Sequence, residues 1–225
     1  MKCLGGLRVA GATVITLCLA WCCTSCSPAA SRLPVSSSVA SATPGEQLWA
    51  STLRGKASNP VEAVSPDGTR LFVSGDVKNY FETVAYSAAT GAQLWARAYR
   101  PATYSNPTAI TVSPDGARVY VTGHTALGGA TVAYDTRTGK QLWARRATLT
   151  AYAASELAVS PDGRSVYVAG SGHKLPFAVI AYAAATGKQR WLRSDTKATV
   201  AGSVAVSPDG KTVYVTGSGG SVPNL

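Results

Sequence analysis

The chain has 225 residues, 46% of them hydrophobic, and a formal net charge of +10, with 21 lysines and arginines against 11 acidic residues. Such an excess of positive charge favours anionic partners. All five cysteines lie within the first 26 residues, so the rest of the chain has neither disulfides nor thiol chemistry. The scarcity of carboxylates leaves little from which to build a calcium site or a hydrolase.

The N-terminus has the pattern of an export signal. Lys2 and Arg8 precede an uncharged, mostly apolar stretch over residues 9–23. This stretch is too short to span a bilayer comfortably, but it suits the core of a signal peptide. We therefore expect a signal peptide over residues 1–26.

The end of this leader resembles a bacterial lipobox. Residues 23–26 read Cys-Thr-Ser-Cys, with a cysteine where leucine is usual. We expect a lipid on Cys26 and a membrane-anchored protein facing outwards, with ordinary cleavage after Ala29 and secretion as the alternative. Residues 27–44 are rich in Ser, Ala and Pro and are expected to form a disordered tether.

The tetrapeptide Ser-Pro-Asp-Gly occurs four times, beginning at Ser65, Ser113, Ser160 and Ser207, with intervals of 48, 47 and 47 residues. Each copy is followed by an apolar run that contains an aromatic residue. A period in the forties with strand-forming residues between turn signals is typical of β-propeller blades.

Each repeat divides into four short strands, named A to D in chain order. In the second repeat the expected strands are residues 109–112, 118–122, 130–134 and 141–145. Pro-Asp-Gly suits the turn between strands A and B, and Thr-Gly suits the turn between C and D. We therefore expect an all-β chain, with a propeller of four-stranded antiparallel blades over residues 45–225. The expected blades are residues 52–99, 100–147 and 148–195, with a partial blade at 196–219.

Two arrangements of the partial blade stay open. Its A and B strands would either meet the leading strand around Trp49 and close a four-bladed ring, or end an open arc that belongs to a longer propeller. We expect the open arc, because the chain reaches Leu225 without a finishing strand.

Two repeated segments carry a family resemblance. The segment from Tyr134, Tyr-Asp-x-x-Thr-Gly-Lys-x-Leu-Trp, resembles the repeat of PQQ-binding-like (quinoprotein-like) propellers. The segment from Val112, Val-Ser-Pro-Asp-Gly-x-x-Val-Tyr-Val-Thr-Gly, resembles the YVTN-type propeller repeat. Together they cover residues 46–219. Proteins with such repeats include dehydrogenases, lactonases and outer-membrane assembly lipoproteins, so the resemblance implies a fold more than an activity.

The enzymes of this resemblance use a disulfide of adjacent cysteines against the quinone, and a calcium site. The adjacent pair here, Cys22 and Cys23, lies in the apolar leader. We therefore predict no PQQ, no calcium or other metal, and no catalytic residues.

The repeated tryptophans and the aspartates of the Ser-Pro-Asp-Gly turns are expected to be structural. A large apolar side chain at one place in every blade packs most economically between blades, and the aspartates cap turns. These residues are Trp49, Trp95, Trp143, Trp191, Asp67, Asp115, Asp162 and Asp209.

Length varies only in the B–C and D–A connections, which lie on one side of a propeller, so binding is expected there. His124 and His173 are placed in B–C loops as exposed residues or, with lower weight, as ligand contacts. The candidate contacts are Tyr80, Phe81, Arg100, Tyr104, His124, Arg146, Tyr152, His173, Lys174 and Phe177.

The sequence thus predicts a non-enzymatic binding or scaffolding module at the bacterial cell envelope. Its expected partners are the membrane, through the anchor, and an envelope protein or an anionic cell-wall polymer. Nucleic acid is not expected, because recognition motifs are absent. The alternative is a quinoprotein-type dehydrogenase, a lactonase-like enzyme, or an inactive fragment of one.

Overall fold

The computed structural model describes residues 46–53, 57–101, 103–147, 153–172, 177–195 and 198–219. The regular structure in these residues consists of strands. No helix among them has the length and hydropathy needed to cross a membrane. The signal peptide, Cys26 and the tether lie outside the described residues.

The strands form four antiparallel sheets, and in each sheet the spatial order follows the chain order. The first sheet contains β1 (Ser58–Val64), β2 (Arg70–Val77), β3 (Tyr80–Ser87) and β4 (Gln93–Tyr99). The second contains β5 (Ser105–Val112), β6 (Arg118–Thr125), β7 (Gly128–Asp135) and β8 (Gln141–Arg146). The third contains β9 (Ala153–Val159), β10 (Ser165–Ser171), β11 (Phe177–Ala183) and β12 (Gln189–Asp195). The fourth contains β13 (Ala198–Val206) and β14 (Val213–Gly219).

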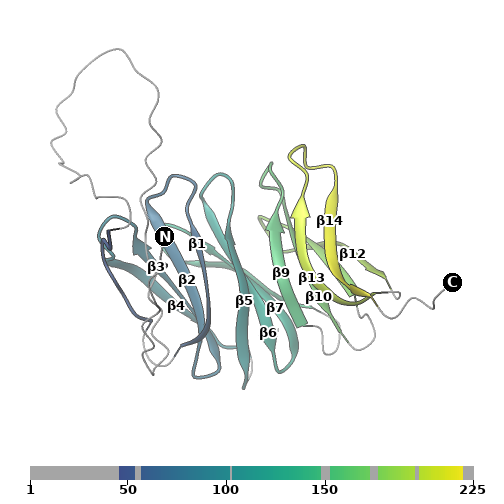
Figure 1. Cartoon of the computed structure of the whole chain (residues 1–225), viewed down its shortest axis with the longest axis horizontal. Coiled ribbons are helices and arrows are strands. Elements are labelled where there is room, and N and C mark those ends of the chain that lie inside the picture. The colour runs from purple at the N-terminus through teal and green to yellow at the C-terminus, as the bar shows by residue number, and fades with distance from the viewer. Residues whose placement is uncertain are drawn as a thin grey trace, which may run out of the picture.

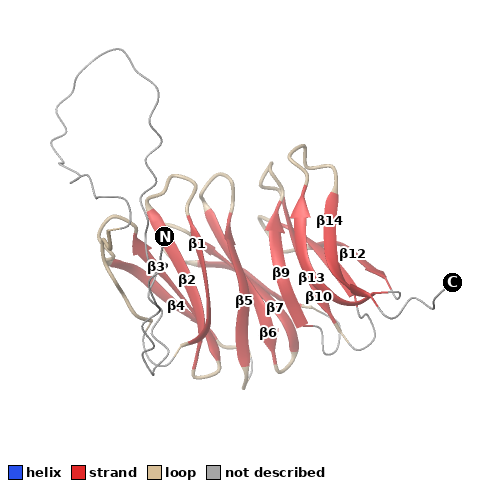
Figure 2. Ribbon diagram, viewed as in Figure 1, coloured by secondary structure: helices blue, strands red, loops and turns tan. Residues whose placement is uncertain are grey.

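The sheets follow one another in a row, with the first and fourth sheets at opposite ends (Figures 1 and 2). Successive first strands contact one another, β1 with β5, β5 with β9 and β9 with β13. This is the arrangement of propeller blades around an axis, with strand A innermost. The expected all-β fold of three complete blades and one partial blade is confirmed, and the described blades form an open arc rather than a closed four-bladed ring.

Several strands extend further than the sequence predicts. Strand β6 continues beyond Gly123 to Thr125, and only two residues separate it from β7. In the first sheet the B–C connection is the two-residue turn Lys78–Asn79, in which both residues have positive φ (53° and 69°). Tight turns of this kind match the twist of the strands that they join, so the hairpin extends to its tip.

Gly123 allows this extension. Strand β5 has a bulge between Pro107 and Ala109, which pushes its backbone towards β6. A Cβ atom at Gly123 would lie 2.1 Å from the carbonyl oxygen of Asn106. Only glycine fits under the bulge, and the same holds at Gly217, where a Cβ atom would lie 2.0 Å from the carbonyl oxygen of Val200.

Neighbouring blades are joined by the strand D tryptophan. The Trp143 side chain is 5% exposed, and its indole Nε1 donates a hydrogen bond to the Ala184 carbonyl of the next sheet at 2.8 Å. Tyr120 of the same sheet and Tyr182 of the next lie on either side of the indole, with ring centroids 5.8 and 6.2 Å away. The indole therefore fills the space between two blades, as expected from its repetition.

At each interface the Thr-Gly turn of the following blade is shaped around the tryptophan, as the turn at Gly139 is around Trp95. Gly139 has a φ of 68°, and a Cβ atom there would lie 2.6 Å from the Trp95 ring. Trp95 donates to the Thr136 carbonyl at 2.9 Å, and Arg97 donates to the Thr138 carbonyl at 3.0 Å. Glycine in this turn thus serves both its backbone conformation and the close approach of the tryptophan.

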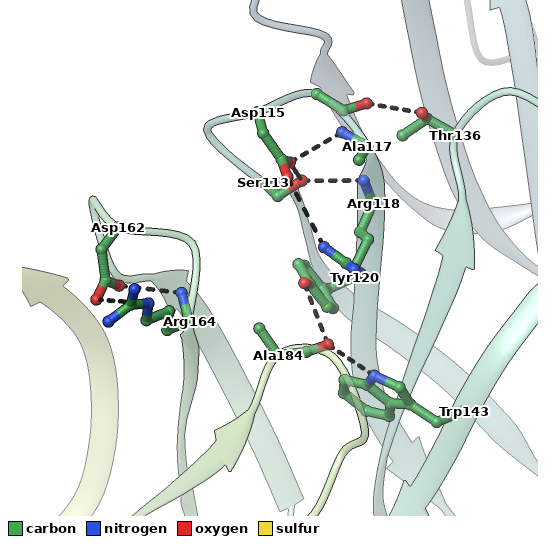
Figure 3. A network of polar contacts seen from close by, with 11 residues as sticks. Ser113, Asp115, Ala117, Arg118, Tyr120, Thr136, Trp143, Asp162, Arg164 and Ala184 are labelled. Carbon is green, nitrogen blue, oxygen red and sulfur yellow. Dashed lines mark hydrogen bonds and ion pairs between the residues drawn. The ribbon is translucent and has the colours of Figure 1, made fainter.

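The Ser-Pro-Asp-Gly turn is closed by its own side chains (Figure 3). The Ser113 hydroxyl donates to the Asp115 carboxylate at 2.5 Å and accepts the backbone N–H of Arg118 at 2.9 Å. The same carboxylate accepts the backbone N–H of Ala117 at 3.0 Å. Through these bonds the Asp115 side chain closes its turn, and Asp67, Asp162 and Asp209 make the corresponding bonds.

The A–B and C–D turns lie together at one end of each blade. Thr136 donates its hydroxyl to the Gly116 carbonyl at 2.7 Å and its backbone N–H to the Ala117 carbonyl at 3.1 Å. Figure 3 shows this link beside the Tyr120 and Trp143 bonds to the next blade. The face that carries the two invariant turns is therefore also the face on which the blades are joined.

Replacing the interblade tryptophan should destabilise the fold strongly. For Trp143→Ala we expect a loss of about 3–5 kcal/mol in the free energy of unfolding, because a buried aromatic side chain leaves a cavity between two blades. Urea unfolding followed by circular dichroism measures the loss. The neighbouring Leu142 is 40% exposed, so Leu142→Ala should change the free energy by no more than about 0.5 kcal/mol. Equal losses in the two variants would contradict the interblade role.

Acid should weaken the turns. Hydrogen bonds from Ser65 and Thr69 lower the pKa of Asp67 from 3.8 to about 2. The folded state therefore binds this proton less readily than the unfolded state, and the stabilisation is present above pH 4 and is lost as the pH falls towards 2. Asp67→Asn should lose less urea resistance than the wild type as the pH falls from about 4.5 to about 2.5, because the wild-type carboxylate is protonated over this range. Glu62→Gln, an exposed acid-to-amide change in the same sheet, is the matched control and should retain the wild-type pH dependence.

Candidate functional site

The best-formed polar and aromatic cluster lies on the B–C and D–A side of the first two sheets. It is built from the Lys78–Asn79 turn, the first residues of β3, the end of β4 and the end of β8. We call Tyr80, Phe81, Tyr99, Arg100 and Arg146 the arginine–aromatic cluster. Four of these five residues, Tyr80, Phe81, Arg100 and Arg146, are among the candidate contacts predicted from the sequence.

Arg100 stacks on Tyr80. Its guanidinium carbon lies 4.3 Å from the centre of the Tyr80 ring, which is within the range of a cation–π contact. Arg100 is exposed and Tyr80 is half-buried. The pair thus presents a positive charge held over an aromatic face at the surface.

Phe81 and Tyr99 lie on the opposite face of the first sheet from Tyr80, in the core between the first two sheets. They are cross-strand partners on β3 and β4, with ring centroids 5.8 Å apart. Phe81 is 1% exposed, so its prediction as a loop side chain available to a ligand is wrong: the longer β3 strand places it in the core. It packs against Tyr99 in the core between the first two sheets.

Arg146 extends the positive charge into the second sheet. It is exposed at the end of β8. Burial raises the pKa of Tyr99, and the charge of Arg146 partly opposes this rise. Tyr99 is therefore a neutral phenol at physiological pH, and the charged side chains of the cluster are its two arginines. Asp76, in the adjoining strand, accepts the backbone N–H of Asn79 at 2.8 Å.

The cluster is fixed across the blade interface. The Ser105 hydroxyl donates to the Asn79 carbonyl at 2.7 Å, which ties the start of β5 to the β2–β3 turn. Tyr104 precedes β5, is 47% exposed, and accepts a hydrogen bond from the Ala126 backbone N–H at its carbonyl. Tyr104 is thus an exposed side chain on a backbone that is held in place.

His124 does not lie in a loop. It is the seventh residue of β6 and pairs with Asn106 and Gly129 in the neighbouring strands. Burial lowers its pKa, so the neutral imidazole is favoured. The predicted strand B ends at residue 122, so the prediction missed that β6 carries His124 into the sheet.

The remaining candidates fall elsewhere. Phe177 begins β11, is half-buried, and lines a hollow at the other end of the arc. Tyr152, His173 and Lys174 lie outside the described residues. The structure therefore brings together the candidates of the first two sheets, and it separates Phe177 from them.

A second hollow, of about 320 Å³, lies on the innermost strands and is lined mainly by polar surface. Glu62 of β1, Thr108 of β5 and Glu156 of β9 contribute to it. Neither glutamate is among the candidate residues predicted from the sequence. When the repeats are aligned on the serine of Ser-Pro-Asp-Gly, both glutamates fall in strand A. They occupy adjacent positions of the repeat, a few residues before that serine.

This hollow does not fit the quinone that the family resemblance implies. PQQ is a polycarboxylate, whereas the described lining has two carboxylates and no cationic side chain. No group of three or more metal-ligating side chains occurs within the described ranges. The donor set of the inner strands thus disfavours an anionic ligand.

The fold is shared with proteins of different activities. Hydrazine synthase of Kuenenia stuttgartiensis is 20% identical, with a TM-score of 0.61 over 73% of this chain and 44% of that chain. A Bacteroides uniformis protein, provisionally named a 6-phosphogluconolactonase, is 19% identical, with a TM-score of 0.57 over 72% of this chain and 48% of that one. BamB from Moraxella catarrhalis is 18% identical, with a TM-score of 0.48 over 65% and 40%.

The chain spans less than half the length of each of these solved structures. No curated protein matches its sequence. A family model described as outer membrane protein assembly factor BamB matches residues 36–175 and, in a second overlapping match, residues 81–225. The chain therefore belongs to the BamB-type family of PQQ-like β-propeller repeat proteins.

Proposed function

We propose that this chain is a non-enzymatic binding module of the bacterial cell envelope, and that its arginine–aromatic cluster binds an acidic surface of a partner protein. The observation that carries the proposal is the Arg100–Tyr80 stack, with its 4.3 Å separation, on a backbone tied across two blades. Arginine and tyrosine are the side chains most enriched among energetically dominant interface residues.

The chemistry of the cluster favours a protein partner with carboxylates. A guanidinium offers paired donors that match a carboxylate, and the Tyr80 ring beneath it holds these donors at the surface. Arg146 and Lys78 are both exposed and add positive charge nearby. The family description, an outer membrane protein assembly factor, supports a protein partner and an envelope location.

The finer proposal concerns the anchor. The lipobox-like sequence at residues 23–26 would place a lipid on Cys26 and hold the propeller at the membrane surface. A tether of Ser, Ala and Pro over residues 27–44 would let the module reach partners that project from the membrane.

Binding through the cluster predicts a loss of envelope association in Arg100→Ala and Tyr80→Ala. We expect each to reduce the fraction that sediments with isolated envelopes by roughly threefold, because either change removes the cation–π pair from the contact. The assay uses a Cys26→Ser background, so that a lipid anchor does not contribute. Arg137→Ala, which removes an exposed arginine from the opposite C–D turn, is the matched control.

Two arms of this assay identify the partner. Protease treatment of the envelopes should abolish sedimentation if the partner is a protein, whereas retention after protease would point to a cell-wall polymer. Equal sedimentation of the Arg100→Ala and Arg137→Ala proteins would refute the cluster as the binding site.

Lipidation predicts a change in phase partitioning. The wild-type protein expressed in its bacterial host should enter the detergent phase of a Triton X-114 separation, because an acyl chain buries many methylene groups. Cys26→Ser should enter the aqueous phase or accumulate as the uncleaved precursor. Mass spectrometry of the mature N-terminus provides the check: a chain that starts after Ala29 would show ordinary cleavage instead.

A further inference from the structure

Two exposed apolar side chains lie together on the B–C and D–A side of the second sheet. Tyr104 is 47% exposed and Leu127 is 54% exposed. The two are brought together by a hydrogen bond from the Ala126 backbone N–H to the Tyr104 carbonyl at 2.9 Å. We call Tyr104 and Leu127 the apolar tip. Since single apolar residues are ordinary on a protein surface, the pair gains meaning only from its setting.

The turn that carries Leu127 has no need of a leucine. Residues Ala126–Leu127 join β6 to β7, and the corresponding turn of the first sheet is Lys78–Asn79. Turns of this kind favour glycine, asparagine and aspartate. The polar pair in the first sheet shows that the fold accepts polar side chains at this place. An exposed side chain that the fold does not use is a candidate for contact with another molecule.

The leucine is held on a fixed backbone. The Leu127 backbone N–H donates to the Thr125 hydroxyl at 3.1 Å, and this hydroxyl donates to the Gly128 carbonyl at 2.6 Å. Thr125 itself is buried. Because the turn is closed by its own side chain, little ordering is needed when Leu127 meets a partner.

Hydrogen bonds connect the apolar tip to both halves of the arginine–aromatic cluster. In the first sheet, the Ser105 hydroxyl, one residue after Tyr104, donates to the Asn79 carbonyl, one residue before Tyr80. In the second sheet, the Ala147 backbone N–H donates to the Gly129 carbonyl at 2.8 Å. This bond holds the end of β8, with Arg146, beside the start of β7. The apolar tip and the cluster therefore form one continuous surface across two four-stranded sheets.

This surface is positively charged around the apolar tip. Its segments, residues 78–80, 99–101, 103–105, 126–127 and 146–147, contain no acidic residue. Lys78, Arg100 and Arg146 are exposed on it. The carboxylate of Asp76, in the adjoining strand, accepts the Asn79 backbone N–H at 2.8 Å and so belongs to the turn. A matching surface must carry carboxylates around an apolar group.

We propose that the apolar tip is the centre of the contact made by the arginine–aromatic cluster, and that the partner protein presents there an apolar side chain surrounded by aspartates or glutamates. This inference rests on the proposed function and specifies its partner. Protein interfaces have an apolar centre and a polar rim. The two parts act differently, since rim charges govern association and its salt dependence, whereas the buried centre governs dissociation.

Salt separates these two parts in the envelope assay. In the Cys26→Ser background, Leu127→Asn should reduce sedimentation with isolated envelopes about fivefold at both about 50 mM and about 200 mM salt, because apolar burial is not screened. The loss in Arg100→Ala should instead be larger at the lower salt concentration, because a charge at the rim is screened.

Two leucine variants are the controls. Leu127→Met should retain sedimentation within about twofold, because it preserves an apolar side chain of similar volume. Leu142→Asn, at a leucine that is 40% exposed on β8, should leave sedimentation unchanged. Asparagine suits a turn, so Leu127→Asn should unfold in urea as the wild type does. Tyr104→Ser removes the other half of the apolar tip without altering the turn, and it should reduce sedimentation in the same salt-independent way.

The outcomes separate this inference from the proposed function. Normal sedimentation of Leu127→Asn and Tyr104→Ser, with reduced sedimentation of Arg100→Ala, would overturn the apolar centre and leave the cluster as the binding site. Normal sedimentation of Arg100→Ala would refute the proposed function, and this inference with it.

Protein-free vesicles test the chemical class of the partner. We expect no sedimentation with vesicles of phosphatidylethanolamine and phosphatidylglycerol, and a loss of sedimentation with protease-treated envelopes. Sedimentation with these vesicles that Leu127→Asn abolishes would overturn the inference, since the apolar tip would then enter a lipid surface.

Discussion

The whole arc depends on the contact between each strand D tryptophan and the C–D turn of the next blade. A four-stranded sheet in isolation would leave both faces exposed, and its neighbours provide the burial that makes it stable. Trp143 fills the gap with an indole that is 5% exposed, and the Ala184 carbonyl accepts both this indole and the Tyr120 hydroxyl. Apolar burial and hydrogen bonding are thus satisfied by one side chain.

This contact explains why the two faces of the chain differ. The indole must meet a turn of fixed shape, so the C–D turn keeps its glycine and its length in each blade, and the A–B turn is tied to it through bonds such as Thr136 to Gly116. The opposite face carries no interblade hydrogen bond of this repeated type in the described residues. Its turns are therefore free to differ, and Tyr80 and Arg100 occur there only once.

Repetition made the fold predictable, and single features of the backbone limited the site prediction. The position of Trp143 was predictable because its motif recurs in register. His124 was misplaced, because the bulge beside Gly123 that lets β6 continue has no sequence signal apart from the glycine itself. Glu62 and Glu156 come together only through the curvature that aligns strands A, which no spacing along the chain expresses.

The arginine–aromatic cluster and the interblade contacts are mechanically linked. Tyr80 is held by a turn that Ser105 of the next blade fixes, so the geometry of the cluster depends on how the first two blades pack. That packing is set at the other end of the same interface by Trp95. Since the blades are stabilised by nearest-neighbour contacts, the position of this turn depends on the packing of the first two blades. The variable turn that carries Tyr80 and the repeated tryptophan contact therefore lie at opposite ends of the interface between the first two blades.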